Sequence, residues 1–428
     1  MPRTVSFSKI KIICVIFCVL LLLSFIAYII TFSVYIPNSL NILQGNTDSF
    51  SYGLPLTATI TPENISVINV NNQEVKENIT VSLSEPVTIS SEDTGQVSMR
   101  IDLFGLPLKT MTLDVIESEE VIPCGMTIGV KVHTEGILVL GTGYVNGENG
   151  DLYKPADGVL KTGDLIRNAN GTPLSGKSEL INMIEESEGD VSLGITRGTQ
   201  ELNTKITPVV SGADKKKKIG VWVRDQTQGI GTITYYKPES GAFGALGHGI
   251  IDVDTRELLS VKSGEVYDSS ISAVKRGKKG VPGELMGDIH KTSVIGEVKH
   301  NSHHGIFGTI YHMDTRGLAK GRMKIGLSSE IHEGPAEILC NVDGEKVSAY
   351  DVYIESVNHN SGDESKGLVL KITDLGLLSQ TGGIVQGMSG SPIIQEDKLI
   401  GAVTHVFVQD PTKGYGIFIE NMLKHENG

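Results

Sequence analysis

Short runs of alternating β-branched and polar residues, separated by glycine, recur along the chain and constrain its fold more than any other feature. One such stretch occupies residues 54–115, and glycine and β-branched residues dominate again from Ile219 to the end. Glycine accounts for 50 of the 428 residues, whereas aromatic residues make up only 5%. Alternation with a period of two is typical of strands, and frequent glycine suits the tight turns between them. We therefore expect a mainly β protein of two or three domains.

The charge balance and the cysteines narrow the function classes. A net charge of -13 and a pI near 5.4 would repel phosphate backbones, so nucleic acid is not expected as a partner. Cys14 and Cys18 lie inside a hydrophobic run, while Cys124 and Cys340 stand alone. This pattern predicts neither a disulfide framework nor a zinc site. A bridge between Cys124 and Cys340 stays open, because spacing alone does not give its geometry.

The N-terminus carries a long apolar run. Arg3, Lys9 and Lys11 precede Ile12 to Ile36, a stretch of 25 residues with few polar interruptions. That length suits a transmembrane helix with its basic end in the cytoplasm, and no small-residue cleavage site follows it. We predict an uncleaved single-pass anchor, so that the membrane is a partner and the remainder of the chain is exported.

Composition shifts divide the rest of the chain. A polar stretch from Pro37 to about Phe50 suggests a tether, and four lysines at 215–218 suggest a boundary. The lysines suit either a solvated linker or attraction to anionic lipid. The predicted domains are the basic end and anchor at 1–36, a tether and small β segment at 37–114, a peptide-binding domain at 115–210, and a catalytic domain at 211–428.

The predicted domain at 115–210 resembles a PDZ domain in the order of its signatures. A glycine-bearing loop from Gly125 to Gly129 precedes an alternating strand from Val130 to His133, and Gly-Asp-Leu-Ile, Asn-Gly and an amphipathic helix at Ser178 to Glu186 follow. PDZ domains pair a peptide as an added strand and bind its carboxylate with loop amides. The resemblance implies peptide contacts at Gly125, Gly129 and Val130. A packing domain that binds nothing is the alternative.

The sharpest motif is Gln-Gly-Met-Ser-Gly-Ser-Pro from Gln386 to Pro392. A serine between glycines can sit on a tight turn with its hydroxyl exposed and neighbouring N–H groups converging on one point. By analogy with chymotrypsin-like peptidases, Ser389 is the candidate nucleophile, and the N–H groups of Gly387 and Ser389 form the candidate oxyanion hole. An α/β-hydrolase elbow does not fit, because position 391 is serine rather than glycine.

A serine nucleophile needs a base, and His248 lies in the glycine-rich string Gly-Ala-Leu-Gly-His-Gly. Histidine can accept the serine proton near neutral pH and later protonate the leaving amine. His300, His303 and His304 form the only histidine cluster in the sequence, within a polar stretch that predicts a solvated loop. No acidic residue or cysteine at ligand spacing joins them, so no metal site and no cofactor are expected.

With these two strings the chain resembles the SpoIVB serine peptidase family of spore-forming bacteria over nearly its whole length. The resemblance implies a chymotrypsin-like double β-barrel with Ser389 as nucleophile, His248 as base and Asp374 as acid. Asp374 precedes the serine by only 15 residues, whereas chymotrypsin-like enzymes generally place the acid much farther upstream. Other carboxylates that could orient the histidine are Asp252, Asp254 and Asp351, in which case Asp374 would serve a structural turn.

The strand from Gly401 to Val406 follows the serine where chymotrypsin-like folds place an edge beside the substrate. Thr404 and His405 are therefore candidate substrate-binding residues, with an ordinary core strand as the alternative.

The resemblance also implies a function. Such a peptidase is exported by the forespore into the space between its two membranes, where it cleaves the extracytoplasmic part of a membrane-bound regulatory protein, and also itself. This cleavage activates intramembrane processing of a late sigma factor. Two alternatives belong to other classes, a noncatalytic PDZ scaffold that docks membrane partners and an extracytoplasmic adhesin or wall-binding β protein.

Overall fold

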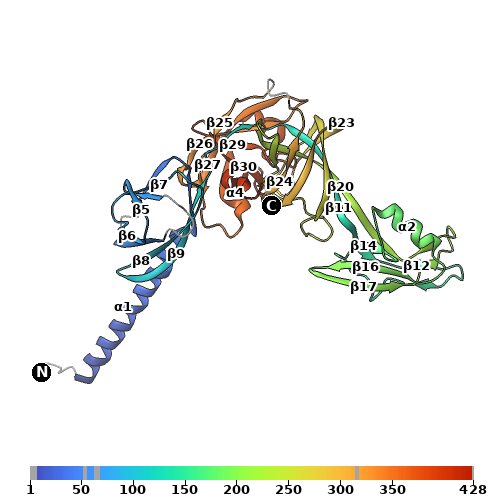
Figure 1. Ribbon diagram of the computed structural model, residues 1–428, viewed down its shortest axis with the longest axis horizontal. Helices are drawn as coiled ribbons and strands as arrows, with labels where there is room; N and C mark the ends of the chain where they lie inside the picture. Colours follow the sequence, from blue (N-terminus) through green and yellow to red (C-terminus); the bar gives the residue numbers. More distant parts are fainter. Residues whose placement is uncertain (1–6, 52–54, 62–67, 314–317, 427–428) are drawn as a thin grey trace. The chain divides into compact units, whose positions relative to one another are not determined.

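The structure is a computed structural model that describes residues 7–51, 55–61, 68–313 and 318–426 (Figure 1). The chain forms two compact units. The first contains Met1–Glu119 with Leu327–Ile331 and Asn358–Gly362, and the second contains the remaining residues. The two units are described in turn.

The first unit consists of helix α1 (Phe7–Tyr35) and two small sheets that share one hydrophobic core. One sheet has the order β1-β9-β8-β3-β6 and the other β2-β7-β4-β5. The strands are β1 (Ser39–Leu43), β2 (Thr47–Phe50), β3 (Leu56–Thr61), β4 (Ile68–Val70), β5 (Gln73–Val75), β6 (Ile79–Ser82), β7 (Val87–Ser91), β8 (Gly95–Leu103) and β9 (Leu106–Ile116). Most of the predicted polar tether is therefore folded, because Ile42 of β1 is buried in this core and Leu43 is buried as well.

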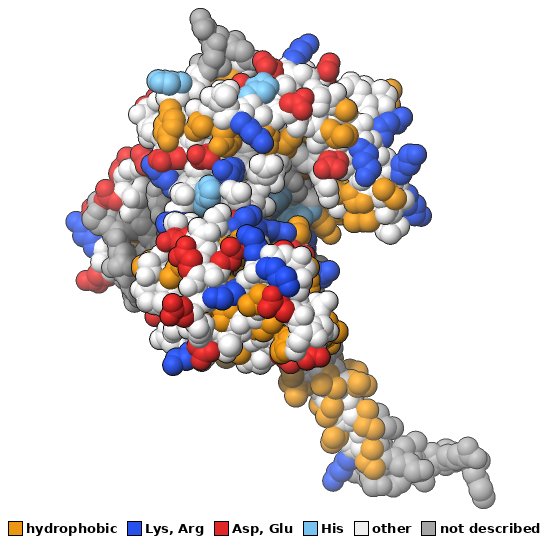
Figure 2. Space-filling model, turned by 90° about the vertical axis from the view of Figure 1, so that its right-hand side faces the viewer, with side chains coloured by type: hydrophobic (Ala, Val, Ile, Leu, Met, Phe, Trp, Pro, Cys, Tyr) orange, Lys and Arg blue, Asp and Glu red, His pale blue; other side chains and the backbone are white. Residues whose placement is uncertain are grey.

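The apolar N-terminal run does not provide the predicted anchor. It forms α1, whose described side chains include exposed Ile, Leu, Val and Phe (Figure 2). Crossing the hydrocarbon core of a bilayer takes about 20 consecutive apolar residues. Within the described part of the chain, no helix has the length and apolar character to do so. The predicted transmembrane helix, and with it the single-pass membrane anchor in the predicted location, is therefore corrected.

The second unit begins with a six-stranded barrel in the order β11-β22-β23-β24-β21-β20, which is closed by pairing between β20 and β11. Its strands are β11 (Thr127–Thr142), β20 (Val221–Lys237), β21 (Ala242–Ala245), β22 (Val261–Lys275), β23 (Glu284–Ser302) and β24 (Gly305–Ile310). Two short strands, β10 (Glu120–Pro123) and β25 (Met323–Lys324), extend the sheet beside β20. Large side chains such as Phe243 and Ile306 fill the interior.

A second closed barrel has the strand order β26-β27-β28-β31-β30-β29. Its strands are β26 (Gly334–Asn341), β27 (Val347–Val357), β28 (Leu368–Ile372), β29 (Pro392–Gln395), β30 (Lys398–Val406) and β31 (Lys413–Phe418). A 3-10 turn, η3 (Glu364–Lys366), precedes β28, and two short helices, α3 (Leu375–Thr381) and α4 (Ile419–Lys424), follow β28 and β31. The predicted mainly β fold with two barrels is thus present, and only its transmembrane part is corrected.

A smaller subdomain lies between β11 and β20 in sequence, and we call it the PDZ-like unit. It contains helix α2 (Lys177–Glu186) and strands β12 (Val145–Asn146), β13 (Leu152–Tyr153), β14 (Leu165–Ala169), β15 (Thr172–Pro173), β16 (Val191–Arg197), β17 (Gln200–Ile206), β18 (Val209–Val210) and β19 (Lys217–Lys218). Its core includes Ile137 of β11, and Val223 of β20 packs against it. The long strands β11 and β20 run from the barrel into this unit (Figure 1). The predicted domain at 115–210 contains all of β11 and none of β20, whereas in the structure both strands are shared between the barrel and the PDZ-like unit.

Candidate active site

A cavity of about 710 Å³ in the second unit brings together residues from both barrels. Its lining includes most of the residues that the sequence marked for catalysis, namely His248, Gly387, Ser389, Thr404 and His405. Leu246 and Gly249, which flank His248, also line it. The nucleophile loop and the base loop therefore face one shared space.

The serine loop connects α3 to β29 and depends on its glycines. The N–H of Met388 donates to the carbonyl of Val385 at 3.1 Å, which closes a tight turn ahead of Ser389. Gly387 and Gly390 have φ angles of 98° and 96°, which glycine adopts readily and other residues rarely do. A Cβ on Gly390 would also lie 2.1 Å from the carbonyl oxygen of Thr232. Glycine is therefore required at position 390 by both conformation and space.

Two backbone donors in this loop are available to a substrate. The N–H groups of Met388 and Gly390 are bonded to Val385 and Val403, whereas those of Gly387 and Ser389 have no hydrogen-bond acceptor among the residues that the structure describes. The carbonyl groups of Gly387 and Ser389 are turned to Thr232, whose hydroxyl and N–H donate to them at 2.8 and 3.2 Å. Unpaired N–H groups beside a candidate nucleophile are what an oxyanion hole requires.

His248 follows β21 in a strained loop. Leu246 and Gly247 have φ angles of 70° and 67°, and the left-handed region is unfavourable for a bulky residue such as leucine. The Nδ1 atom of His248 lies 3.0 Å from the carbonyl oxygen of Gly249. A carbonyl only accepts hydrogen bonds, so Nδ1 carries the proton in this contact and Nε2 of the neutral ring keeps its lone pair. Burial lowers the pKa of His248, which favours this neutral form.

The serine hydroxyl is directed at a carbonyl rather than at the histidine. The Oγ of Ser389 donates to the carbonyl oxygen of Thr404 at 2.7 Å. Transfer of the proton to His248 requires a change of the serine rotamer, which is a small motion about one bond. Hydrogen bonds of catalytic groups are often formed only once substrate is bound.

His405 lies beside the base, at the exposed side of the cavity. Its ring centroid is 5.0 Å from that of His248, with the ring planes inclined by 33°. Desolvation by the cavity wall, with repulsion from His248 as the next cause, lowers the pKa of His405 to about 4. His405 is therefore neutral near pH 7, and it adds no positive charge next to the base.

Asp374 lies elsewhere. Its carboxylate accepts a 2.7 Å hydrogen bond from the N–H of Leu377 and caps helix α3. It is not part of the lining that contains Ser389 and His248, and no carboxylate is bonded to the His248 ring within the described residues. Among the described residues of the lining, Asp363 is the one acidic side chain, and it forms an ion pair of 2.8 Å with Lys366.

Two of the three alternative acids also pair with other side chains, and the third supports the Asp374 segment through its backbone. Asp252 and Asp254 both pair with Arg224, at 2.5 and 3.0 Å. The backbone carbonyl of Asp351 accepts hydrogen bonds from the N–H groups of Thr373 and Asp374.

The predicted peptide-binding strand lies inside the first barrel. Residues 128–133 pair with β20 on one side and with β22 on the other, so they have no free edge for an added strand. A Cβ on Gly125 would lie 2.7 Å from Leu339, and one on Gly129 would lie 2.6 Å from Ile289. These glycines allow close packing, and Val130 is a buried residue that lines the catalytic cavity.

Comparison with protein families matches residues 215–423 to the family described as SpoIVB peptidase S55. This part of the chain belongs to the SpoIVB peptidase family. The match covers just under half of the chain, and it includes both glycine-rich strings. The resemblance drawn from those strings is confirmed, and the family indicates that this part of the chain is a peptidase. The comparison with curated proteins gave no match.

Among solved structures, the chain is similar to the PDZ domain of the SdrC-like protein from Listeria monocytogenes. The two share 22% sequence identity with a TM-score of 0.18, and the similarity covers 22% of this chain and 90% of that one.

Sequence reasoning missed Thr232, which holds the serine loop, and Asp363, which lines the cavity. Each directly follows a glycine, Gly231 and Gly362, but neither lies in a string that by itself predicts a catalytic role. Only the pairing of β20 with its neighbours and the position of η3 bring them to the site.

Proposed function

We propose that this SpoIVB-type peptidase is a serine endopeptidase with Ser389 as nucleophile and His248 as general base. The observation that carries the proposal is the shared cavity, which holds a glycine-framed serine, a neutral histidine and two unpaired backbone donors among the described residues. A scaffold that only docks partners has no need of this combination. No cofactor is part of the proposal.

The proposed reaction follows from these groups. The Oγ of Ser389 attacks the substrate carbonyl while Nε2 of His248 takes its proton, and the N–H groups of Gly387 and Ser389 bind the resulting oxyanion. His248 then protonates the leaving amine, and water hydrolyses the acyl-enzyme through the same base. The Gly249 carbonyl orients the ring through Nδ1, which is the task that an aspartate performs in other serine peptidases.

The family name implies a role in sporulation, and the proposed substrates are a membrane-bound regulatory protein and the chain itself. Thr404 and His405 lie at the wall of the cavity and are proposed to contact the substrate. Self-cleavage between residues 39 and 50 would require strands β1 and β2 to open, because both are paired in sheets.

A second proposed activity is peptide binding at the PDZ-like unit, and it is favoured by the position of α2. Lys177 at one end of α2 pairs with Asp225 at 3.7 Å, and Glu185 at the other end pairs with Lys216 at 2.9 Å. Residues 221–224 pair with β11 on one side only, among the described strands. Ile181 shares the helix face of Lys177 and Glu185 and is 46% exposed. A peptide added beside β20 would cover this side chain.

The catalytic proposal is tested by labelling the full chain with a fluorophosphonate probe. Wild-type protein is expected to be labelled at Ser389, and Ser389→Ala should lose both labelling and peptide hydrolysis, with turnover lowered by about 10⁶ as for other triad serines. Ser391→Ala is the matched control, because this buried hydroxyl has no hydrogen-bond partner among the described residues. Labelling that persists in Ser389→Ala would disprove the assignment. Mass spectrometry of the two variants after incubation tests self-cleavage.

Peptide binding is tested separately, by titrating a library of free C-terminal peptides onto the full-length Ser389→Ala protein. Ile181→Asp should abolish binding. Lys205→Ala should not, since Lys205 is an exposed residue of β17, which pairs with β16 and is not part of the proposed groove. Equal binding by both variants would rule out the proposed groove.

A further inference from the structure

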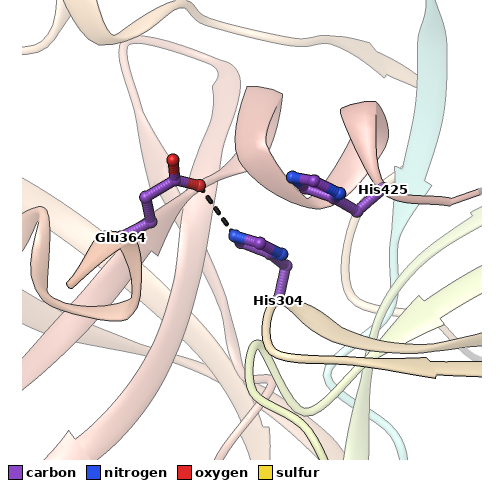
Figure 3. A group of neighbouring side chains, drawn as sticks. All are labelled: His304, Glu364 and His425. Atoms are coloured by element: carbon purple, nitrogen blue, oxygen red, sulfur yellow. Dashed lines mark ion pairs between the residues drawn. The ribbon is translucent and has the colours of Figure 1, made fainter. Parts of the chain in front are cut away.

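Three side chains from distant parts of the sequence meet near the catalytic cavity. His304 lies in the turn between β23 and β24, Glu364 lies in η3, and His425 follows helix α4. The Nε2 of His304 is 2.7 Å from a carboxylate oxygen of Glu364. The rings of His304 and His425 are stacked, with centroids 3.8 Å apart and planes inclined by only 4°. Figure 3 shows the Glu364 carboxylate directed at His304, with the His425 ring lying over the His304 ring.

The cluster offers one ligand atom from each residue, and these three atoms lie within 4.8 Å of one another. Two imidazoles and one carboxylate form a ligand set that zinc uses in proteins, with a fourth position left for water. The Nδ1 of His304 is also buried and has no hydrogen-bond partner among the described residues. Buried polar atoms in folded proteins nearly always have a partner. The hydrogen bonding of the His304 ring is therefore incomplete within the described residues.

We propose that His304, Glu364 and His425 bind one zinc ion. Tetrahedral zinc with nitrogen and oxygen ligands about 2.0–2.1 Å away places its ligand atoms about 3.3 Å apart. The Nε2 of His304 and the Glu364 oxygen, now 2.7 Å apart, must therefore separate slightly, whereas ligand atoms that lie up to 4.8 Å apart must approach one another. The two rings must also turn out of their parallel stack, because the lone pair of each nitrogen lies in the plane of its ring. Rotation of a histidine ring about χ2 is soft, and Glu364 is 52% exposed and free to adjust.

The ion would join three segments of the fold. The turn that carries His304 belongs to the first barrel, whereas η3 and α4 flank strands of the second barrel. The two residues next to Glu364, Asp363 and Ser365, line the catalytic cavity. The proposed ion is thus a brace between the two barrels that form this cavity, and its binding does not depend on the proposed catalytic role of Ser389.

The test is equilibrium dialysis of the full chain, first stripped with a chelator, against micromolar zinc. One zinc ion per chain is expected for the wild type. His425→Ala and Glu364→Gln should each weaken binding by more than about 100-fold, since loss of a residue that only supports a ligand already costs about 10- to 100-fold. His332→Ala is the matched control, because His332 pairs with Glu396 at 3.2 Å without a second imidazole. Unchanged zinc content in His425→Ala would overturn the proposal.

Two further measurements separate this site from others. Zinc should raise the midpoint of thermal unfolding in the wild type but not in His425→Ala, since an ion that binds only the folded state stabilises it. Cobalt substituted for zinc should give a visible absorption spectrum that His425→Ala lacks. His290→Ala alters a second group of possible ligands, Asp268, His290 and Glu345. Loss of the bound zinc in His290→Ala rather than in His425→Ala would also overturn the proposal.

Discussion

The hydroxyl of Thr232 donates a 2.8 Å hydrogen bond to the carbonyl oxygen of Gly387, and so connects the first barrel to the serine loop of the second. The N–H of the same threonine donates to the carbonyl of Ser389 at 3.2 Å. These carbonyl groups belong to the peptides that carry the N–H groups of Met388 and Gly390, which alternate along the loop with the proposed donors of Gly387 and Ser389. Thr232 is fully buried and holds the proposed oxyanion hole without lining the cavity itself.

Replacing Thr232 by valine should lower kcat by about 10- to 100-fold with little change in KM. Valine keeps the shape and the backbone N–H but loses the hydroxyl, so the peptide that joins Gly387 to Met388, between the two donor N–H groups, loses one of its hydrogen bonds. The donors are then held less firmly, and loss of one oxyanion donor costs about 10²- to 10³-fold in other enzymes. Steady-state kinetics with a peptide substrate measure the effect.

Thr232→Ser is the control for this prediction, because serine keeps the hydroxyl and should restore most of the turnover. If Thr232→Ser is as slow as Thr232→Val, the hydrogen bond to Gly387 is not what maintains the site.

The acid limb of the pH profile should lie below pH 6.5. His248 must be neutral to accept the serine proton, and burial lowers its pKa below the ordinary value of 6.5, so the base stays active to a lower pH than a solvated histidine would. The rate of fluorophosphonate labelling between pH 4 and 8 measures this limb. His405→Asn should leave its midpoint in place, because the pKa of His405 is about 4 and its ring is neutral over most of that range. A midpoint above 6.5 would contradict the proposed environment of His248.

The parts of the site that the sequence could predict are those whose chemistry is local. Ser389 and His248 are each framed by glycines that the loops require, as the clash at Gly390 and the φ angle of Gly247 show. Strand alternation predicts the β composition, whereas the two barrels are implied by the family resemblance. By contrast, His304, Glu364 and His425 are brought together only by tertiary structure, so no spacing rule could unite them.

Two other sequence-based predictions fail for physical reasons. A glycine loop followed by a strand occurs in many folds, and the sequence alone does not distinguish them. From the sequence, the pattern at Val130 is interpreted as a peptide-binding strand, but this strand is paired on both edges and has no room for a peptide. The predicted domain boundaries miss the shared strands, because β11 and β20 contain 16 and 17 residues and register shifts occur along their pairing. In the sequence, one long strand with register shifts is hard to distinguish from two shorter strands that follow one another.

Asp252→Ala should lower the free energy of unfolding by about 2–3 kcal/mol, somewhat less than the about 3–5 kcal/mol for a fully buried pair, since Arg224 is partly exposed. The Asp252 side chain is fully buried and pairs with Arg224. Asp254→Ala should lower the free energy of unfolding by less than about 1 kcal/mol, because Asp254 pairs with the same arginine but its side chain is 45% exposed. Urea unfolding of both variants measures the difference, and equal values would mean that the burial of Asp252 is unimportant.

The stability difference between the wild type and Asp252→Ala should also depend on pH. Burial by itself would raise the pKa of Asp252, but the N–H groups of Thr255 and Asp254 and the charge of Arg224 together lower it. A carboxylate whose pKa is lowered on folding stabilises the protein above its unfolded pKa, near 3.9, and the stabilisation is lost as the pH falls through the folded value. The gap between the wild type and Asp252→Ala should therefore narrow below about pH 4.

The role of Asp374 can be decided with two substitutions at that position. In the present geometry its carboxylate caps α3 and does not contact His248, so Asp374→Asn should keep turnover within about threefold, since asparagine caps helices as well as aspartate does. Asp374→Ala should cost about 1 kcal/mol of stability through loss of the cap, with turnover again near the wild type. Kinetics and thermal unfolding of both variants test this. A triad acid would instead give a loss of roughly 10²- to 10⁴-fold in Asp374→Asn with stability unchanged. That result would mean that the active enzyme rearranges to bring Asp374 to His248 in place of the Gly249 carbonyl.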